Sequence, residues 1–123
     1  MDGIKQKKRL FSLNKRCDFN LVFKQGFASS TKHLVIYARS NNLDYHRLGF
    51  SISKKIGKAV VRNRIRRLIK EAMRKIILDF PFNSDFIFIA KKTAQDVTLN
   101  DLVCEIQVYL RKYYDECLKK NNN

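Results

Sequence analysis

The sequence predicts an α+β domain in which helices pack on a mixed four-stranded sheet to form a two-layer α/β sandwich. Residues 61–76 carry apolar side chains at helical spacing, whereas residues 33–40 and 47–53 alternate between apolar and polar side chains as strands do. The predicted order is helix, strand, strand, helix, strand, helix, with a short additional strand near Ser29. A chain of 123 residues with 45% hydrophobic side chains is long enough to bury one core.

A first helix is predicted from Asn14 to Gln25. Asn14 has the side chain of an N-cap residue, and Gly26 is where the helix is expected to stop. Phe19 and Phe23 lie one turn apart on this helix. Aromatic residues at that spacing serve either as core or as a ligand-binding surface, and the sequence leaves both roles open.

Two strands follow this helix, and alternate side chains of each are expected to face the core. Those side chains are Leu34, Ile36, Ala38, Leu48, Phe50 and Ile52. The opposite face of the sheet then carries Val35, Tyr37, Arg39, Gly49, Ser51 and Ser53. The small residues of that second face form either a solvated surface or the floor of a groove for a nucleic-acid backbone.

The strongest pattern lies between Lys54 and Lys75, where ten Lys or Arg residues accompany one acid, Glu71. Apolar residues recur there every three or four positions, which predicts a helix with one buried face. They are Val61, Ile65, Leu68, Ala72 and Ile76. A stripe of cations runs beside that face, namely Arg62, Arg66, Lys70 and Arg74. Like charges at this spacing repel one another, so the stripe is either a solvated face or a surface for a polyanion.

The beginning of this helix favours a surface for a polyanion. Lys54, Lys55 and Lys58 lie at the N-terminal end, where the helix dipole disfavours cations. The backbone N–H groups at the same end bind anions, and Gly57 lets another backbone come close. Cations and N–H donors around one turn therefore predict a phosphate-binding site.

The last third of the chain predicts an interior strand and a final helix. Residues 86–90 are apolar at every position, as in a strand buried on both faces. Thr98 and Asp101 have the pattern of a capping box at the start of a helix. The inward side chains of that helix are expected to be Leu102, Ile106, Tyr109 or Leu110, and Tyr113.

The charge balance indicates the partner. Lys and Arg outnumber Asp and Glu by 26 to 11, for a formal charge of +15, so a polyanion is expected and nucleic acid is the predicted one. No membrane partner is expected, because the apolar residues are needed for the core and no run reaches the length of a span. Cys17, Cys104 and Cys117 have neither CxxC spacing nor a nearby His. We therefore expect free thiols in a reducing cytoplasm, without a secretory signal.

No catalytic or metal-binding motif is recognisable in the sequence. His33 and His46 are the only histidines, and nothing in their spacing brings them together as general acid and base. The acids are scattered and do not have the spacing of a two-metal carboxylate cluster. The sequence therefore predicts a protein that positions RNA, with no catalytic residue, metal ligand or cofactor of its own.

The run from Arg47 to Arg74 strongly resembles the protein subunit of bacterial ribonuclease P. The hallmark of that family is an Arg-Asn-Arg helix, here Arg62-Asn63-Arg64, followed by Arg66 and Arg67. The resemblance extends over residues 9–118, which are expected to form one RNA-binding domain. Residues 1–8 are then a basic, disordered N-terminus and residues 119–123 a frayed tail.

The resemblance implies an auxiliary subunit that works 1:1 with a catalytic RNA. In that family the RNA, with its own Mg²⁺, removes the 5′ leader from precursor tRNA, and the protein holds the leader between the first helix and the open sheet face. The family fold also implies a left-handed β-α-β crossover that carries the basic helix, against the usual right-handed rule.

Matched by position, the residues implied to contact the leader are Phe19, Phe23, Tyr37, Val35, Arg39 and Ser51. Those implied to contact the catalytic RNA are Lys54, Lys55, Lys58, Arg62, Asn63, Arg64, Arg66, Arg67 and Lys70. Three alternatives stay open: a ribosomal-type RNA-binding protein, a DNA-binding regulator and a protein-only nuclease. The basic helix lacks the preceding helix and short turn of a helix-turn-helix, which argues against the regulator.

Overall fold

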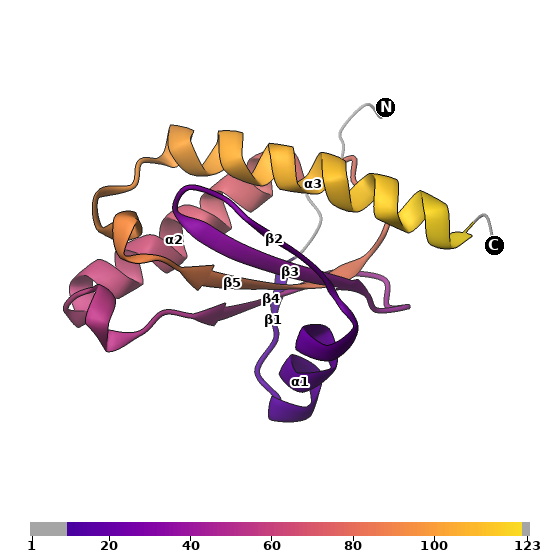
Figure 1. Cartoon of the computed structure of the whole chain (residues 1–123), viewed down its shortest axis with the longest axis horizontal. Coiled ribbons are helices and arrows are strands. Elements are labelled where there is room, and N and C mark those ends of the chain that lie inside the picture. The colour runs from indigo at the N-terminus through magenta and orange to yellow at the C-terminus, as the bar shows by residue number, and fades with distance from the viewer. Residues whose placement is uncertain (1–9, 122–123) are drawn as a thin grey trace, which may run out of the picture.

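The computed structural model describes residues 10–121, which form a five-stranded sheet, three α-helices and two short 3-10 helices (Figure 1). The strands are β1 (Leu10–Ser12), β2 (Phe27–Ser30), β3 (Leu34–Ser40), β4 (His46–Ser51) and β5 (Ser84–Ala90). The helices are α1 (Arg16–Gln25), α2 (Ala59–Ile76) and α3 (Leu99–Asn121), with 3-10 helices η1 (Lys54–Ile56) and η2 (Lys92–Asp96). The expected N-terminus, 1–8, lies outside the described residues, as do residues 122–123 of the expected tail.

The strand order is β1-β4-β5-β3-β2, so β5 is central, as its apolar sequence predicts. β3 is antiparallel to its neighbours β2 and β5, whereas β4 is parallel to its neighbours β1 and β5. The adjacent parallel strands β4 and β5 are joined by a crossover that carries α2; its left-handed sense stays a prediction. The predicted short strand near Ser29 is β2, whereas the fifth strand, β1, is not predicted. Its three residues are too few to show alternation.

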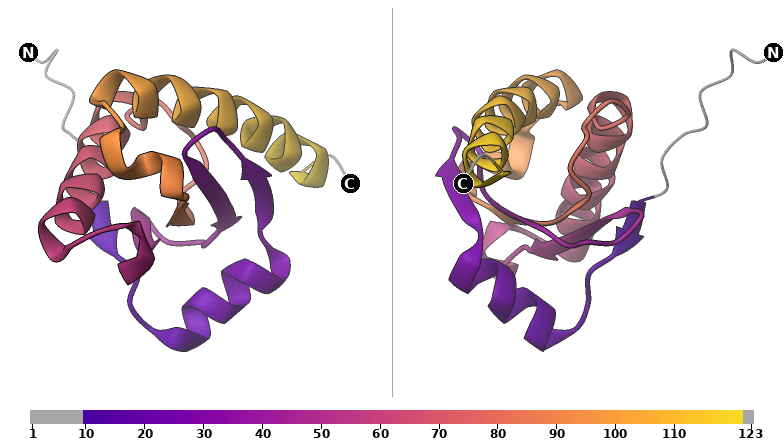
Figure 2. Two further views of the ribbon diagram at one scale, coloured as in Figure 1. Left: turned by 60° about the vertical axis from the view of Figure 1, so that its left-hand side comes forward. Right: turned by 90° about the vertical axis from the view of Figure 1, so that its right-hand side faces the viewer.

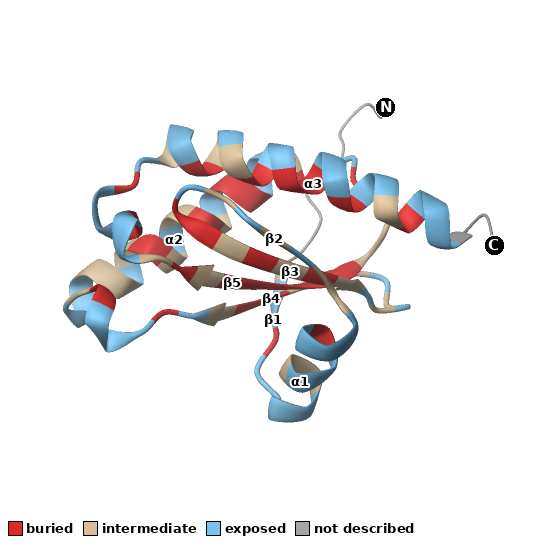
Figure 3. Cartoon of the chain, in the orientation of Figure 1, coloured by how far each residue is buried: buried red, intermediate tan, exposed pale blue. Residues whose placement is uncertain are grey.

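Helices α2 and α3 cover one face of the sheet, and α1 lies on the other (Figure 2). The main core fills the space between the sheet and α2 and α3, where the buried surfaces of these elements meet (Figure 3). The predicted core residues of the two strands are buried there, namely Leu34, Ile36, Ala38, Leu48 and Ile52. Phe50, predicted with them, is only half-buried.

The buried face of α2 is centred on Ile65, Ile69, Ala72 and Met73, each 0% exposed. Val61, Leu68 and Ile76, which the sequence predicts to be buried, are half-buried on the flank of the helix. The predicted face is therefore displaced. The spacing of apolar residues does not reveal which face of α2 is buried, because both the predicted and the observed face carry apolar side chains. Packing against the sheet and α3 selects one of the two faces.

α2 begins at Ala59, so Lys54 and Lys55 belong to the separate turn η1 and not to one continuous helix. Gly57 separates the two elements, and a Cβ at Gly57 would lie 3.1 Å from the side chain of Val61. Gly57 therefore leaves room for the side chain of Val61, and its expected close approach to another backbone stays a prediction.

The helix ends confirm some of the predicted caps. Gly26 ends α1, with its N–H donating to the carbonyl of Val22 at 2.7 Å. The N-cap of α1 is Lys15, without a side-chain cap, so the prediction for Asn14 is wrong.

The capping box at the start of α3 is confirmed: the Thr98 N–H donates to Asp101 at 3.2 Å, and the Asp101 N–H donates to the Thr98 hydroxyl at 3.1 Å. The hydrogen bond from the Thr98 backbone lowers the pKa of Asp101. All the predicted inward side chains of α3 are buried, namely Leu102, Ile106, Tyr109, Leu110 and Tyr113. The helix continues through Lys119 and Lys120 to Asn121, so these residues are helical and not a frayed tail.

Candidate nucleic-acid interface

The sheet face beneath α1 is built of three rows of side chains, because the register of β3, β5 and β4 aligns their outward residues. The ionic row is Arg39, Asp85 and Arg47. The covered row is Tyr37, Ile87 and Gly49, and the open row is Val35, Ile89 and Ser51.

Helix α1 lies on the covered row and fills the space above it. Phe23 meets Tyr37 edge-on, with ring centroids 4.9 Å apart. Phe19 packs so closely on Gly49 that a Cβ there would lie 2.6 Å from its ring. The missing side chain of Gly49 thus admits Phe19, a residue of this chain. The interpretation of Gly49 as the floor of a groove for a nucleic-acid backbone stays a prediction.

The open row stays accessible beside α1. Ser51 is exposed, Val35 and Ile89 are half-buried, and Phe23 keeps 40% of its surface exposed. Apart from Ser51, these residues and two neighbouring aromatic rings form an apolar surface. We call it the aromatic strip, and it consists of Phe19, Phe23, Tyr37, Val35 and Ile89. Sequence reasoning misses Ile89, because nothing in a strand that is apolar on both faces marks which side chains face outward.

Two arginines of the ionic row hold the two ends of α1. Arg47 reaches Asp18, in the first turn of α1, at 3.4 Å. Arg39 donates from Nε to the side-chain oxygen of Gln25, the last residue of α1, at 3.0 Å. The resemblance assigns Arg39 to the leader. In the structure Arg39 belongs to the ionic row, and the covered row separates it from the open row.

Arg62 and Arg64, the two arginines of the Arg-Asn-Arg motif, hydrogen-bond inside the protein. Arg62 Nε donates to the carbonyl of Gly57 at 3.2 Å, which holds the turn before α2. Arg64 Nη2 donates to the carbonyl of Val97 at 2.8 Å, which ties the start of α3 to α2. Each guanidinium retains further N–H donors, since it has five. The sequence alone does not reveal the second contact, because Val97 lies 33 residues away.

The cations that stay exposed surround η1 and the outer side of α2. Among the residues predicted to contact RNA they are Lys54, Lys55, Lys58 and Arg67; Arg74 and Lys75, near the end of α2, are exposed as well. Gln95 of η2 donates a hydrogen bond to the carbonyl of Ile56, so the lysine-bearing turn is held in place. A fixed group of cations beside the N-terminus of a helix is suited to bind phosphates.

Asn63, Arg66 and Lys70 lie along one flank of α2. Arg66 donates to the side-chain oxygen of Asn63 at 2.8 Å. The Lys70 ammonium lies 5.7 Å from the centre of the Phe50 ring, at the edge of the sheet. The structure therefore brings this part of the predicted RNA surface next to β4.

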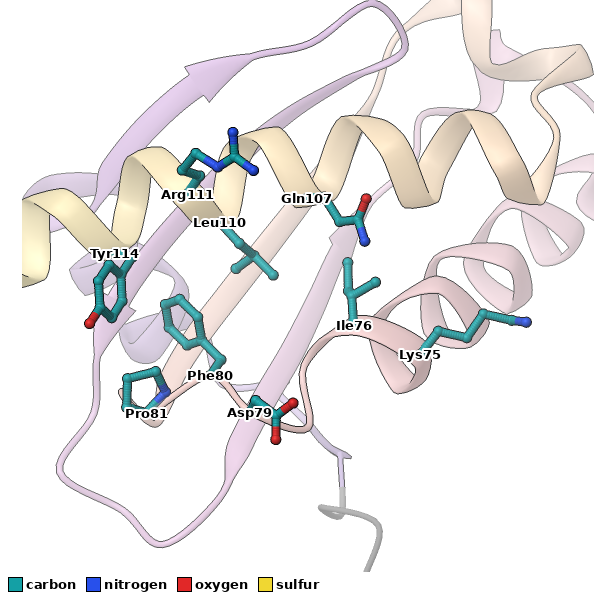
Figure 4. Close-up of a pocket in the computed structure, with 9 residues that line it drawn as sticks. All are labelled: Lys75, Ile76, Asp79, Phe80, Pro81, Gln107, Leu110, Arg111 and Tyr114. Atoms are coloured by element: carbon teal, nitrogen blue, oxygen red, sulfur yellow. The ribbon is translucent and has the colours of Figure 1, made fainter. Parts of the chain in front are cut away.

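A hollow of about 740 Å³ lies on the other flank of α2, between that helix, the loop after it and α3 (Figure 4). Ile76 and Leu110 point toward each other across it, and Lys75 and Arg111 extend outward from the two helices. Asp79 also lines the hollow. None of the residues predicted to contact RNA belongs to its lining.

The two histidines lie near opposite ends of β5. The carbonyl of His33 accepts from Lys91, just after the strand, whereas the ring of His46 accepts from the N–H of Ser84, its first residue. A seven-residue strand separates these points by about 20 Å. His33 instead contacts Glu105 of α3. The two histidines therefore do not form an acid–base pair.

Among residues 10–121, no group of three or more His, Cys, Asp or Glu side chains could hold a metal ion. No helix among residues 10–121 is long and apolar enough to cross a membrane. The three cysteines are free, and burial raises the pKa of Cys117.

The cations around η1 and α2 and the accessible aromatic rings beside α1 define a nucleic-acid-binding protein, because cations bind phosphates and aromatic rings stack on bases. Residues 7–114 match the family model Ribonuclease P. The chain belongs to the ribonuclease P protein family, whose members are RNA-binding proteins of tRNA processing.

Relatives and solved structures agree with this assignment. The ribonuclease P protein component of Clostridioides difficile (strain 630) is 46% identical over 95 residues, covering 76% of this chain and 83% of the relative. That of Alkaliphilus metalliredigens (strain QYMF) is 37% identical over 100 residues, covering 81% and 90%. The Staphylococcus aureus RNase P protein superposes with a TM-score of 0.72 at 32% identity, covering 85% of this chain and 97% of that structure. The Thermotoga maritima RNase P protein gives 0.72 at 30% identity, covering 82% and 96%.

Proposed function

We propose that the chain is the protein subunit of ribonuclease P, and that it binds both the catalytic RNA and the 5′ leader of precursor tRNA. One observation carries the proposal: the exposed cations and the aromatic strip form two separate surfaces near β4. The exposed cations lie on η1 and α2, which come after β4 in the chain. The aromatic strip is formed by α1 and the sheet face that it covers, which is the face opposite α2. One rigid domain with two such surfaces is suited to contact two RNA segments together. Membership of the family supports the same function.

The aromatic strip is proposed to bind the leader by stacking. Stacking on Phe or Tyr tolerates every base and contributes about 1–3 kcal/mol per base, which suits leaders of varied sequence. Phe23 and Tyr37 supply the rings, and Val35 and Ser51 lie beside them in the open row. Phe19 and Arg39 support this surface, since Phe19 packs on Gly49 and Arg39 contacts Gln25 of α1.

The catalytic RNA is proposed to bind the cations of η1 and α2. The proposed contacts are Lys54, Lys55, Lys58, Arg62, Asn63, Arg64, Arg66, Arg67 and Lys70. Each phosphate that a cation neutralises releases counterions, so assembly is expected to weaken steeply with salt. Arg62 and Arg64 have a further role, because both already hold backbone carbonyls of this chain.

Bond cleavage is assigned to the RNA and its Mg²⁺, and binding to the protein. The RNA hydrolyses one phosphodiester and leaves the mature 5′ end of the tRNA with a phosphate. The protein, as one RNA-binding domain over residues 9–118, holds the leader in the cytoplasmic 1:1 complex and so raises the affinity for precursor over mature tRNA.

The test is to add the protein to a cognate catalytic RNA at a low Mg²⁺ concentration, where the RNA alone cleaves precursor tRNA poorly. One equivalent of protein is expected to raise cleavage sharply, and protein without RNA is expected to be inactive. A ribosomal-type RNA-binding protein would bind RNA without this stimulation. Absence of stimulation rejects the subunit assignment, and cleavage by the protein alone rejects the assignment of catalysis to the RNA.

A further inference from the structure

We propose that a groove at the edge of β4 binds one ribose-phosphate unit of an RNA strand, an inference that rests on the function proposed above. The groove has a volume of about 370 Å³, at the small end of the range for ligand sites. Its lining comes from the segment between β1 and α1, from β4 and from α2. The lining residues are Ser12, Leu13, Asn14, Phe19, Leu48, Gly49, Phe50, Arg66 and Lys70.

The groove exists because β1 pairs with β4 only as far as Leu48. The N–H of Leu13 donates to the carbonyl of Leu48 at 2.8 Å, after which the chain turns away toward α1. Backbone groups of alternate strand residues point to the same edge. The N–H of Phe50 therefore points toward the groove, where it can donate to a phosphate or ribose oxygen.

The charge of the groove favours an anion. Arg66 and Lys70 line it, and none of its described lining residues is acidic. Three other hollows in the described part of the chain have cations too, but each also includes an acid. Those acids are Asp79, Glu105 and Glu116. Charge complementarity to a phosphate thus distinguishes the groove at β4 from these three hollows.

The two cations are already positioned at the groove. The side-chain oxygen of Asn63 accepts from Arg66 at 2.8 Å, and Lys70 lies over the ring of Phe50 at 5.7 Å. Neither contact uses all the N–H donors of its cation. A phosphate bound here therefore meets donors whose orientation is largely set beforehand, which lowers the entropy lost on binding.

The location of the groove explains what it would do. Phe19 of the aromatic strip forms one wall, and Arg66 and Lys70 of the basic helix form another. An RNA strand that passes from the aromatic strip to α2 crosses the edge of the sheet at this groove. The groove would thus fix the path of that strand between the two proposed RNA surfaces.

The first test compares two variants of the full-length protein that make the same chemical change. Asn14→Asp adds a negative charge within the groove, whereas Asn20→Asp adds it on the exposed side of α1. Asn14→Asp is expected to weaken RNA binding by about tenfold or more, because the added carboxylate lies beside the bound phosphate. Asn20→Asp is expected to change binding by less than about twofold, because that charge is solvated and screened.

Binding is measured in two arms that separate the possible sources of the ribose-phosphate unit. One arm measures the affinity for the catalytic RNA alone, and the other measures the affinity of the assembled complex for precursor and for mature tRNA. A loss in the first arm assigns the unit to the catalytic RNA, and a loss confined to precursor assigns it to the leader. Either result supports the groove, and equal effects of the two variants in both arms overturn it.

A second pair of variants covers the case in which Asn14→Asp does not fold. Lys70→Gln removes a cation from the groove, and Lys75→Gln removes one from the opposite flank of α2. Lys70→Gln is expected to lower the slope of log affinity against log salt by about 0.7–0.9, and Lys75→Gln to leave it unchanged. An unchanged slope for Lys70→Gln in both arms overturns the groove. If the wild-type protein fails to stimulate cleavage, the proposed function itself is wrong, which is a separate outcome.

Discussion

Arg47 and Asp85 form a bidentate ion pair beneath α1: Nε and Nη2 of the arginine each donate to a different carboxylate oxygen at 2.7 Å. Asp85 is 3% exposed and also accepts from the side chain of Asn41 at 2.9 Å. The hydrogen bond to Asp85 raises the pKa of Arg47, so the guanidinium stays charged. Because its third nitrogen reaches Asp18, the pair also fixes the first turn of α1 over the sheet. The position of the aromatic strip therefore depends on this pair.

Replacing Arg47 with Met is expected to lower the free energy of unfolding by about 3–5 kcal/mol, because it leaves the buried Asp85 carboxylate without its counter-charge. Urea denaturation measures the loss. Arg39→Met is the matched control in the same row, and its exposed contact with Gln25 predicts a loss of no more than about 1 kcal/mol. Adding Asp85→Asn to Arg47→Met is expected to recover part of the stability. Equal losses for Arg47→Met and Arg39→Met would contradict this account.

Tyr37→Ala is expected to weaken the binding of precursor tRNA to the assembled complex by about 1–3 kcal/mol, the contribution of stacking one base. Mature tRNA, which lacks the leader, is expected to bind as before. Tyr45→Ala is the control, because that ring pairs with Phe11 next to β4 and lies outside the aromatic strip. Equal weakening of precursor and mature tRNA by Tyr37→Ala would remove Tyr37 from the leader site.

Arg64 and Arg67 are predicted to differ although both belong to the basic helix. Arg64→Met is expected to destabilise the fold by about 1–3 kcal/mol, because the carbonyl of Val97 loses a charged donor. Arg67→Met, at an exposed position, is expected to change stability by less than about 0.5 kcal/mol. It should instead lower the salt slope of RNA assembly by about 0.7–0.9 if it contacts one phosphate. Thermal unfolding measures the stability of the two variants, and salt titration of RNA binding measures their salt slopes. Equal changes in both quantities for Arg64→Met and Arg67→Met would contradict the predicted difference.

Glu105 makes stability depend on pH. Burial alone would raise the pKa of Glu105, but hydrogen bonds from Thr31 and His33 outweigh it and lower the pKa below its usual value of 4.5. A lowered carboxyl pKa adds stability that is complete above the unfolded value and is lost as the pH falls through the folded one. Glu105→Gln is therefore expected to reduce the free energy of unfolding by about 1–3 kcal/mol at neutral pH.

The difference between wild type and Glu105→Gln is expected to shrink as the pH falls below the usual carboxyl pKa and through the lowered pKa of Glu105. Denaturant unfolding at several pH values measures it. Glu116→Gln serves as the control, since its partner Lys119 is an exposed neighbour on the same helix at 3.6 Å. That variant is expected to change stability by less than about 1 kcal/mol at any pH. A pH-independent effect of Glu105→Gln would refute the proposed linkage.

The sequence predicts well wherever a signal is local. Alternation over residues 34–38 places Leu34, Ile36 and Ala38 in the core, and the Thr98–Asp101 capping box marks the start of α3. It fails where the neighbours decide the outcome. The buried face of α2 is displaced toward Ile69 and Met73, because packing chooses between two apolar faces.

The sequence likewise predicts only part of the candidate nucleic-acid interface. Residue type and spacing identify the cations of η1 and α2 as one group. Only the family resemblance assigns Phe23 and Tyr37 to the leader, since spacing alone leaves a core role open for Phe23. They cannot show that Arg64 is bound to Val97 or that Phe19 covers Gly49, because these partners are distant in the chain.

The amino-acid sequence alone is enough to recognise an α+β domain with a large surplus of positive charge, gathered in a basic helix and its preceding turn. Composition and periodicity suffice for that, because both act residue by residue along the chain. The folded structure is needed to see which arginines hold the fold, which aromatic residues stay accessible, and where a groove opens beside β4. These properties depend on strand register and on the packing of helices against the sheet, which bring residues together across the fold and leave no local pattern in the sequence.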